Sequence, residues 1–475
     1  MVDPAVRLCA LPTLCVFLAG CQVSFLHDLG SYSLEVCGDG VVQPGEECDE
    51  GPHNSDEISN ACRSACKRPW CGDGVVDADE ECDDANETNS DGCNDDCTAW
   101  LWTINFDQNG EDTYAWDMAC DSQGQVVVTG MTHTASTEDD ILVLKLDSEG
   151  GLVWSITVNG DGDGDDSGNG VAVDSQDNII VTGVMTRTRG DLDVWTAKYS
   201  PQGQIVWTAT HDGPGGSDDV GGGVAVDSDD DIVVTGSDGA TDGQTRLWVR
   251  KYDASGAEVW TRTVQGVESV RSYANNGNSV ATDEVGNIFV AGSIGRTLDR
   301  LDSWVGTYDE SGDLQWSATH SGGGGGHCYD ELTDVVPDGQ GGVFVIGHEC
   351  MPDASHADKF SSIWVARYEN DGELGWYRSE SQQDSEYNLG YGIAVDVNGD
   401  VLAIGSMEYG ELGGGVWLRK YDSAGEEVWT RTYANRAGDR AVGLSVCTDP
   451  DGNIVIAGGE RVDGRDYIWI RKYMP

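Results

Sequence analysis

The chain has few basic residues. It holds 27 lysines and arginines against 84 aspartates and glutamates, so its formal net charge is −57. A surface of this charge repels nucleic acid and anionic lipid headgroups, and it favours cations and basic partners. Nucleic acid is therefore excluded as a partner. The acidity does not imply disorder, because a regular pattern of tryptophan and valine supplies a core.

Helical periodicity and the common catalytic motifs are missing as well. No long stretch repeats its apolar residues every 3.6 positions, which excludes a helical solenoid. There is no nucleophile elbow, zinc-protease motif or arginine triad, and the turn DASGAEVW lacks the spacing of the sialidase aspartate box. We therefore assign no catalytic residue. Paired loop carboxylates would suffice for a polysaccharide lyase or hydrolase, but the many aspartates allow no pair to be named.

Three markers recur along the chain at steps of 52 to 60 residues. Each period has a tryptophan, a glycine that closes an apolar run, and an aspartate nine positions before that glycine. The tryptophans are Trp102, Trp154, Trp207, Trp260, Trp316, Trp376 and Trp429; the glycines are Gly130, Gly183, Gly236, Gly292, Gly347, Gly405 and Gly458; the aspartates are Asp121, Asp174, Asp227, Asp283, Asp338, Asp396 and Asp449. Recurrence at this period indicates a repeat architecture.

Each copy predicts four short strands. In the second copy these are GVAVD, NIIVTG, VWTAKY and IVWTAT. The turns between them are rich in Asp, Ser, Asn and Gly, which let the strands fold back as hairpins. Four strands in about 50 residues, repeated along the chain, are the signature of a β-propeller blade.

The two ends of the repeat complement each other. The segment LWTINF around Trp102 has the pattern of an outer strand, and the last copy, which ends at Tyr473, has three strands and no outer one. If the N-terminal strand completes the last blade, the ring has no open edge. We therefore predict an all-β, seven-bladed propeller of four-stranded blades, closed by its own N-terminal strand, with a monomer as the default state.

Most of the 16 tryptophans fit the repeat and are expected in the core. Seven occupy the outer strand and six the third strand, where Leu142 replaces the seventh. Large rings at regular strand positions pack between neighbouring sheets. Trp70, Trp100 and Trp116 lie outside the pattern and are the better candidates for exposed positions.

The repeat resembles a known family of propellers. Motifs such as GVAVDSDDDIVVTGS and WVRKYDASGAEVW are similar to the seven-bladed propeller repeat of bacterial secreted and cell-surface proteins, over residues 100–475. That family is defined by its fold and is not tied to one reaction. The resemblance therefore implies the architecture and leaves the function open.

The N-terminus resembles the signal peptide of a bacterial lipoprotein. Residues 8–18 are apolar but too short to span a bilayer, and they are followed by LAGC, which ends at Cys21. In this resemblance Cys21 becomes the lipidated first residue and anchors the protein to a membrane surface. The charged region has only Arg7, offset by Asp3. The alternative is a plain signal peptide with an incidental cysteine.

A cysteine-dense segment lies between this anchor and the propeller. Its two units both open with CGDGVV, continue to EEC and close with a C-x-x-x-C step, as in a tandem duplication. Eight cysteines with almost no aliphatic core predict a disulfide scaffold in an oxidising compartment, with three possible connectivities in each unit. Zinc is disfavoured, because the spacing does not match a paired finger.

The resulting organisation has five parts. They are a signal peptide (1–20), a linker (21–36), a first cysteine-rich repeat (37–70; Cys37, Cys48, Cys62 and Cys66), a second (71–99; Cys71, Cys82, Cys93 and Cys97) and the propeller (100–475).

The CGDG, EECDD and DGC pattern resembles the cysteine-rich repeat of myxobacterial surface proteins. The second unit matches it through Asp83, Asp84, Asn86 and Asp91, whereas the first has DEGPHN and SNAC in the corresponding places. Carboxylate and amide oxygens are the ligands that calcium prefers, so the second unit is a candidate calcium site. The alternative is that these side chains cap turns and solubilise the segment.

Two further cysteine pairs are predicted in the propeller. Cys328 and Cys350 flank a hairpin turn of the fifth copy and are expected to be bridged across its first two strands. Cys120 and Cys447 lie in the inner strands of the first and last blades, one and two residues before the marker aspartate. This parity places them on facing sides of adjacent blades, where a disulfide would fasten the ring at its closure.

Binding residues are expected on one face of the propeller. Turns between strands one and two, and three and four, are short and uniform, whereas the connections between strands two and three and between blades vary. The variable loops emerge together around the central channel. His327, His348 and His356 in the fifth copy suggest a metal, but no ligand spacing links them, which favours unrelated loop residues.

The loop NGDGDGDDSGNG is the sharper candidate for a metal. Asp161, Asp163 and Asp165 alternate with glycine, so their carboxylates could converge on a calcium ion. The loop lacks the final glutamate of an EF-hand, and an acid recurs at the same point of the repeat as Asp112 and Asp218. That recurrence favours a structural loop cap.

These features together predict a surface-anchored lipoprotein that acts as a non-enzymatic binding or scaffolding module. Its ligand would be a protein or a glycan, and Ca²⁺ is the one candidate cofactor. The expected localisation is export, with lipid anchoring at the bacterial outer membrane or cell surface. The alternative function is an extracellular enzyme, a lyase or hydrolase, acting on polysaccharide.

Overall fold

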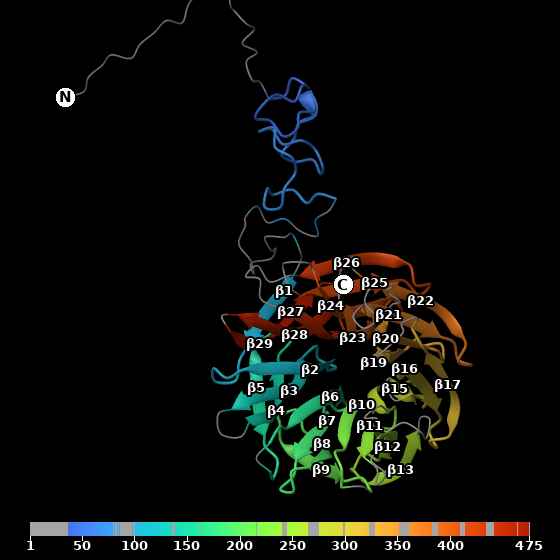
Figure 1. The fold of residues 1–475 in the computed structure, drawn as a ribbon. Coiled ribbons are helices and arrows are strands. Elements are labelled where there is room, and N and C mark those ends of the chain that lie inside the picture. The colour runs from blue at the N-terminus through green and yellow to red at the C-terminus, as the bar shows by residue number, and fades with distance from the viewer. Residues whose placement is uncertain are drawn as a thin grey trace, which may run out of the picture. The chain divides into compact units, whose positions relative to one another are not determined.

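The computed structural model in Figure 1 describes residues 37–78, 80, 83, 85, 97, 100–134, 138–162, 164–214, 216–239, 245–264, 275–297, 300–322, 328–350, 361–381, 388–408, 414–433, 441–462 and 464–474. The chain divides into two compact units, Met1–Asn86 and Glu87–Pro475. Each unit has its own stabilising interactions.

The first unit is a loop-rich scaffold held by disulfides. Its described part contains one short 3-10 helix, η1 (Gly51–His53). Disulfides join Cys37 to Cys66 and Cys48 to Cys62, which selects one of the three connectivities open to the first repeat. The disulfides therefore stabilise these loops in place of a hydrophobic core.

A buried arginine connects the first cysteine-rich repeat to the second. Arg63 is 2% exposed, and its guanidinium group lies 2.6 Å from the Asp73 carboxylate and 2.5 Å from that of Asp77. In the second repeat Cys71 and Cys97 are both disulfide-bonded. Cys82 and Cys93 lie outside the described residues.

Seven four-stranded antiparallel sheets form the blades of a β-propeller in the second unit, as predicted. Blades 1 to 6 each use four strands in chain order. Blade 1 has β2 (Thr113–Cys120), β3 (Val126–Thr134), β4 (Glu138–Leu146) and β5 (Leu152–Val158); blade 2 has β6 (Ser167–Val173), β7 (Ile179–Thr186), β8 (Leu192–Tyr199) and β9 (Ile205–His211); blade 3 has β10 (Val220–Val226), β11 (Ile232–Gly239), β12 (Thr245–Tyr252) and β13 (Glu258–Val264). Blade 4 has β14 (Asn276–Thr282), β15 (Ile288–Thr297), β16 (Arg300–Tyr308) and β17 (Leu314–His320); blade 5 has β19 (Glu331–Pro337), β20 (Val343–Cys350), β21 (Ser361–Tyr368) and β22 (Leu374–Glu380); blade 6 has β23 (Asn388–Val395), β24 (Val401–Glu408), β25 (Gly414–Tyr421) and β26 (Glu427–Tyr433). In addition, the two-residue strand β18 (Cys328–Tyr329) pairs in parallel with β16.

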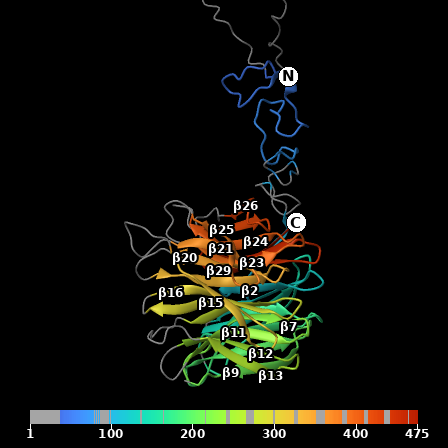
Figure 2. The ribbon, with the colours of Figure 1, turned by 90° about the vertical axis from the view of Figure 1, so that its right-hand side faces the viewer.

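Blade 7 closes the ring with strands from both ends of the second unit. Its order is β1 (Trp100–Phe106), β29 (Arg465–Tyr473), β28 (Ile454–Val462) and β27 (Ala441–Thr448). Strand β1 runs antiparallel to β29, with Asn105 opposite Trp469, so the predicted closure is confirmed. Figure 2 shows the same ring turned by 90°.

A disulfide fastens the same junction at the centre of the ring. Cys120 of β2 and Cys447 of β27 are bonded, which joins blade 1 to blade 7 across 327 residues of chain. The bridge predicted from their opposite parity is therefore present. Cys350 at the end of β20 is also disulfide-bonded. The Cys328 side chain lies outside the described part, so its pairing with Cys350 stays a prediction.

The core is divided among the junctions between blades. Seven hydrophobic clusters are present, and each one draws its residues from two neighbouring blades. The six third-strand tryptophans are at most 4% exposed: Trp195, Trp248, Trp304, Trp364, Trp417 and Trp469. The prediction that these rings pack between sheets is confirmed.

The tryptophans of the outer strands contact the blade that follows in the chain. The indole N–H of Trp102 donates to the Ser148 carbonyl at 2.9 Å, and four others make the equivalent bond. A glycine with positive φ, such as Gly256 (φ 87°), lies under the ring, where a Cβ atom would be 2.7 Å from Trp207. No described glycine lies under Trp429, because the outer strand of blade 7 is β1 and no turn joins it to β29.

The marker aspartates organise the turns between the first two strands. In each blade one carboxylate oxygen accepts the amides two and four residues further on, as Asp121 does from Gln123 and Gln125 at 2.9 Å. The other oxygen pairs with a cation of the third strand, as in Lys145–Asp121 at 2.9 Å. Six blades contain this largely buried ion pair, and Thr307 stands in the place of the cation in blade 4.

The marker glycines allow the inner strands to bulge. A Cβ atom at any of the seven positions would lie 1.8 to 2.3 Å from a carbonyl oxygen of the neighbouring inner strand. Immediately after that carbonyl, every inner strand shifts its register in a β-bulge. Glycine is required because only a bare Cα leaves room for this approach.

Adjacent glycines of β28 provide a matched test of this requirement. A Cβ on Gly458 would lie 1.9 Å from the Val442 carbonyl oxygen, whereas one on Gly459 would be 3.7 Å from its nearest neighbour. We expect Gly458→Ala to lower the free energy of unfolding by about 1–3 kcal/mol, as overpacking does. Gly459→Ala should leave it within about 0.5 kcal/mol. Urea denaturation of the two variants measures this, and equal losses would contradict the role assigned to the bulge.

Candidate functional site

A pocket opens at the mouth of the central channel, on the face that carries the variable loops. Its volume is about 400 Å³, which is within the range of small-ligand sites. It lies between blades 1, 6 and 7, at the ends of strands that lead into the variable loops. We call it the mouth pocket; its lining residues are Tyr114, Ala115, Trp116, Tyr391, Val442, Leu444, Gly459, Glu460, Arg461 and Asp466.

The bulges of the inner strands place their extra residues along the channel. In chain order the bulged residues are Trp116, Asn169, Gly222 with Gly223, Asn278, Thr333, Tyr391 and Leu444. A bulge turns its extra residue away from the regular alternation of a strand. All of these residues line the channel, so the glycine that permits each bulge also determines where the variable side chain is presented.

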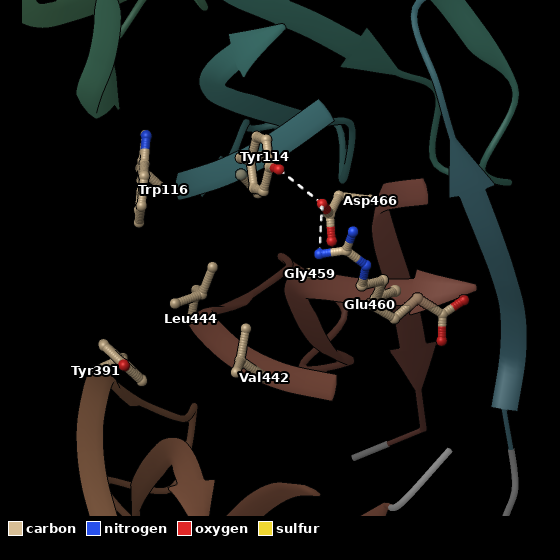
Figure 3. Close-up of a pocket in the computed structure, with 10 residues that line it drawn as sticks. Tyr114, Trp116, Tyr391, Val442, Leu444, Gly459, Glu460 and Asp466 are labelled. Carbon is tan, nitrogen blue, oxygen red and sulfur yellow. Dashed lines mark hydrogen bonds and ion pairs between the residues drawn. The ribbon is translucent and has the colours of Figure 1, made fainter. Parts of the chain in front are cut away.

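Two aromatic rings flank the mouth pocket. Trp116 on β2 is 42% exposed, in agreement with its place outside the repeat pattern, and Tyr391 comes from β23. Figure 3 shows both around one hollow, with Leu444 and Val442 between them. Aromatic rings with an exposed face offer a large apolar contact at a low entropic cost.

Polar groups line the opposite side of the mouth pocket. The Tyr114 hydroxyl donates to the Asp466 carboxylate at 2.7 Å, and the Arg461 guanidinium lies 3.8 Å from it (Figure 3). Burial, followed by the hydrogen bond to Asp466, raises the pKa of Tyr114, so the phenol stays protonated. Glu460 points away from the hollow and accepts a 2.5 Å hydrogen bond from Asn105 of β1.

The channel continues below the mouth pocket as a polar chamber of about 220 Å³, which we call the inner channel. Trp116, Tyr391 and Leu444 line both spaces. Two carboxylates, Asp117 and Asp334, line the inner channel from blades 1 and 5. The two spaces therefore form one funnel, with aromatic walls at the mouth and acidic groups inside.

Each channel carboxylate accepts three hydrogen bonds from neutral donors. Asp117 receives the amides of Met118 at 2.7 Å and Val171 at 2.9 Å, and the Ser445 hydroxyl at 3.1 Å. Asp117 thus ties blade 1 to both of its neighbours.

Asp334 repeats the arrangement in blade 5. It accepts the Val335 amide at 2.8 Å, the Ile393 amide at 2.8 Å and the Ser279 hydroxyl at 2.6 Å. Among the described residues, neither Asp334 nor Asp117 forms an ion pair.

Removal from bulk water keeps these two carboxyl groups partly protonated near neutrality. Burial raises the pKa of Asp117 to about 7, and the charge of Asp334 adds to the shift. Burial raises the pKa of Asp334 to about 6. In each case the desolvation of the charged form outweighs the three hydrogen bonds that favour it.

These shifts predict that the propeller is more stable at mildly acidic pH. A carboxyl group whose pKa is raised on folding binds more protons in the native state, so its contribution is full below pH about 4 and is lost as pH rises through 6 to 7. For Asp117 the loss is at most about 4 kcal/mol. Between pH 5 and 8 the free energy of unfolding should therefore fall less steeply in Asp117→Asn/Asp334→Asn than in the wild type.

Urea titrations at several pH values provide the measurement, with the exposed Asp161→Asn as the control. An unchanged slope in the double variant would show that the channel carboxylates ionise as they do in water.

The predicted calcium loop of blade 2 is organised by a different acid. Asp161 lies 3.6 Å from Arg187, Asp165 is exposed, and Asp163 is outside the described residues. Asp166 is fully buried and accepts the amides of Gly160 and of Thr186, the latter at 2.6 Å. The buried oxygens thus cap the loop, and calcium there stays a prediction.

The acid that recurs nine residues before the marker aspartate, one position before Asp166 in blade 2, joins adjacent blades. Asp218 accepts the Leu192 amide at 3.1 Å, and Asp112 accepts the Asp466 amide at 3.1 Å. The predicted capping role therefore holds for these two. They cap the start of the third strand in the preceding blade, whereas their neighbours Asp166 and Asp219 hold the loop of their own blade.

Three acids between blades 2 and 3 form a group of potential metal ligands. Carboxylate oxygens of Asp193, Asp212 and Asp219 lie within 4.8 Å of each other. Arg187 bonds Asp193 at 2.7 Å and Arg189 bonds Asp212 at 2.8 Å. The two guanidinium groups already supply positive charge to this cluster.

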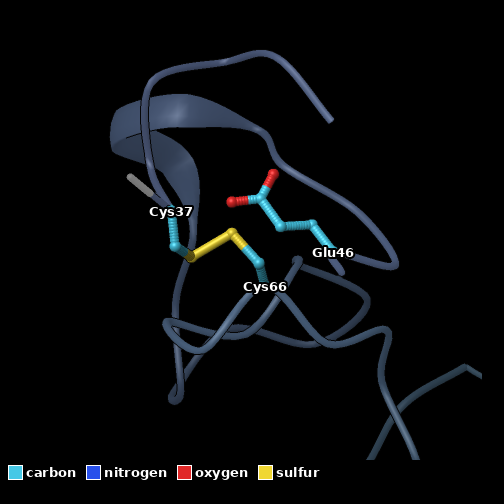
Figure 4. Close-up of side chains that lie close together, drawn as sticks. All are labelled: Cys37, Glu46 and Cys66. Atoms are coloured by element: carbon cyan, nitrogen blue, oxygen red, sulfur yellow. A yellow bond between two sulfur atoms is a disulfide. The ribbon is translucent and has the colours of Figure 1, made fainter. Parts of the chain in front are cut away.

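The first unit has one further group of potential ligands, and Asp83 is the predicted calcium ligand described there. Cys37, Glu46 and Cys66 lie together, but Figure 4 shows the two sulfurs joined in the disulfide, so neither is a thiolate. Asp83 accepts the amides of Gly72, Asp73, Gly74 and Ala85 at 2.8 to 3.0 Å.

In the first repeat, Asp49 takes the place of Asp83. It accepts the amides of Gly38, Asp39, Gly40 and Gly51 at 2.8 to 3.2 Å. A turn-capping role therefore suits Asp83, which is the alternative that the sequence left open. Asp84, Asn86 and Asp91 lie outside the described residues, as does the lipidation candidate Cys21.

The histidines of the fifth copy are not brought together within the described part. His348 belongs to strand β20, where its Nε2 lies 4.0 Å from the Glu331 carboxylate, and burial lowers its pKa. His327 and His356 fall outside the described residues.

Sequence reasoning missed most of the funnel. Only Trp116 was singled out, because it breaks the tryptophan period. Asp117 and Asp334 stand four residues before their marker aspartates, where the other copies have glycine or serine. An acid at a position that varies between copies, among positions that recur, was the available signal. In a chain with 84 acidic residues, two further aspartates are not conspicuous.

Comparison with known proteins gives architecture and little else. Residues 56–98 match the family described as a domain of unknown function (DUF4215). No curated protein sequence matches the chain. Together with the disulfides, the match places a cysteine-rich region before a seven-bladed propeller, and multiple disulfides indicate an exported protein.

Several solved structures are similar to the chain at low identity. A catalytically inactive virginiamycin B lyase from Staphylococcus aureus, with quinupristin, is 13% identical over 78% of this chain and 99% of that one, with a TM-score of 0.45. A PL25 ulvan lyase is 10% identical over 77% and 95%, with a TM-score of 0.47. Drosophila semaphorin 1b is 7% identical over 79% and 87%, with a TM-score of 0.43. None of these likenesses carries an argument about function.

Among the described residues, no helix has the length and apolar character needed to cross a bilayer.

Proposed function

We propose that the protein is an exported, lipid-anchored surface protein whose propeller is a non-enzymatic binding module, with a glycan as its ligand. The lipid anchor rests on the LAGC sequence ending at Cys21. The disulfide-rich repeats suit a spacer between anchor and propeller, because bridges keep a small domain folded outside the cell.

The mouth pocket is the single observation that supports binding most strongly. It is concave, it has aromatic walls, and a few polar groups converge on one side of it. A pyranose ring has an apolar face of C–H groups and a rim of hydroxyls. Trp116 and Tyr391 would pack against the faces, while Arg461 and Asp466 would bond the hydroxyls.

The alternative function is a polysaccharide lyase or hydrolase. Tyr114 is poorly suited to act as its base, because the raised pKa keeps the phenol protonated at neutral pH. Glu460 is bonded to Asn105 and turned away from the hollow. These two features favour retention of a saccharide over its cleavage.

Trp116 provides the test of the proposal. We expect saturable binding of at least one neutral tetrasaccharide from a panel of cellotetraose, laminaritetraose and the N-acetylglucosamine tetramer, without release of products. Trp116→Ala should weaken that binding at least about tenfold, because loss of a stacked ring removes roughly 1.4 kcal/mol or more. Trp70, which is 45% exposed in the first unit, provides the matched control Trp70→Ala.

Calorimetry and product analysis by mass spectrometry together decide the outcome. Binding that Trp116→Ala leaves unchanged would exclude the mouth pocket as the site. Turnover of any tetrasaccharide would support the enzyme in place of the binding module.

A further inference from the structure

We propose that the funnel selects a ligand carrying a protonated amine, which enters past the aromatic mouth and rests above the carboxylates of the inner channel. This inference rests on the proposed function, because it assigns a chemical class to the ligand of the same site. The class is an ammonium group on a sugar or on a peptide side chain.

The first support is the uncompensated charge of the inner channel. Asp117 and Asp334 are held by six hydrogen bonds from amides and hydroxyls, and among the described residues neither forms an ion pair. The marker aspartates of six blades, by contrast, pair with a lysine or an arginine. Two carboxylates without a counter-ion in one chamber therefore attract a cation.

The second support is the position of the aromatic rings. Trp116 precedes Asp117 directly, and Tyr391 lines both the mouth pocket and the inner channel. A cation that enters through the mouth pocket passes these rings on its way to the carboxylates. The face of an aromatic ring attracts a cation within about 6 Å, most strongly for tryptophan. The rings and the acids thus favour the same ligand group.

The third support is the set of charges at the mouth. Among the described residues that line the mouth pocket, Arg461 is the one cationic side chain, and its nearest partner there is Asp466 at 3.8 Å. The titratable groups lining the inner channel are Asp117, Asp334 and Tyr391. No described lysine, arginine or histidine lines that chamber, and the net charge of the chain is −57. The field throughout the funnel therefore favours positive ligands.

The size of the two spaces suits a saccharide end better than a folded partner. The mouth pocket holds about 400 Å³ and the inner channel about 220 Å³. A ring can occupy the wider space while a substituent extends into the narrower one. An amino sugar has this shape, and a lysine side chain is the other source of the same group.

The test compares two oligosaccharides of equal length that differ in the nitrogen substituent, a free amine in one and an N-acetyl group in the other. We expect the glucosamine tetramer to bind the intact protein at least about tenfold more tightly than the N-acetylglucosamine tetramer, as measured by calorimetry at pH 7 and low salt. Equal or weaker binding of the amine would overturn the inference and leave the proposed function in place. Absence of binding by both tetramers would overturn the inference, and the proposed function would fall with it only if cellotetraose and laminaritetraose also failed to bind.

A tetralysine arm distinguishes the sources of the amine. If tetralysine binds more tightly than the glucosamine tetramer, the ammonium preference holds and a basic peptide is the ligand. If it binds no better than the acetylated tetramer, the sugar is required as well. Raised salt should weaken every charged ligand and leave the acetylated tetramer unchanged.

Two variants separate the rings from the acids. Trp116→Leu keeps an apolar side chain at an exposed position and removes the π face, so it should lower the preference for amine over N-acetyl at least about threefold. Trp116→Phe should retain most of that preference. An unchanged preference in Trp116→Leu would exclude the ring from cation selection.

The pH dependence of binding tests the carboxylates without any substitution. A fully N-trimethylated glucosamine tetramer keeps its charge at every pH. Its affinity should fall at least about fivefold from pH 7.5 to 5.5, as the channel carboxyl groups take up protons. The double variant Asp117→Asn/Asp334→Asn should abolish the dependence, and a flat profile in the wild type would exclude the inner channel from recognition.

Discussion

In every blade a carbonyl oxygen of the inner strand lies directly against the Cα atom of a glycine in the second strand. This contact is possible only without a side chain, and it lets the inner strand bulge by one or two residues. The bulge in turn places its extra residue beside the central channel. The repeat therefore fixes a backbone feature seven times, while the residues at and after the bulge vary from blade to blade.

The remaining markers hold the blades that this contact shapes. Each tryptophan of an outer strand, except Trp429, is positioned over a glycine turn of the next blade, and each marker aspartate closes a turn. Six of those aspartates also neutralise a buried lysine or arginine. An acidic chain can thus keep its cations inside as structural partners while its surface stays negative. In the inner channel, Asp117 and Asp334 have no such partner among the described residues and are held by amides and hydroxyls.

The blades and their closure could be predicted because they depend on residues that recur. The copy around Trp102 has an outer strand without the three strands that should precede it, and the last copy, which ends at Tyr473, has three strands without an outer one. The outer strand of blade 7 therefore had to come from the N-terminal segment. Cys120 and Cys447 could be paired by parity for the same reason.

The site could not be predicted in the same way, because it uses the positions that do not recur. Tyr391 and Leu444 are ordinary residues of apolar strands until the bulge turns them inward. The acids of the 161–166 loop were the more conspicuous pattern, but hydrogen bonds to backbone amides account for the buried one, Asp166. Loop closure needs buried acceptors, whereas ligand binding needs groups that face an open space, and sequence alone does not distinguish them.

A crystal structure of the protein with the bound glucosamine tetramer tests the central claim most directly. The account predicts the terminal sugar in the mouth pocket against Trp116 and Tyr391, with its amine within about 6 Å of the indole ring and directed towards Asp117. A saccharide bound at the outer strands, or on the opposite face among the uniform short turns, would contradict it.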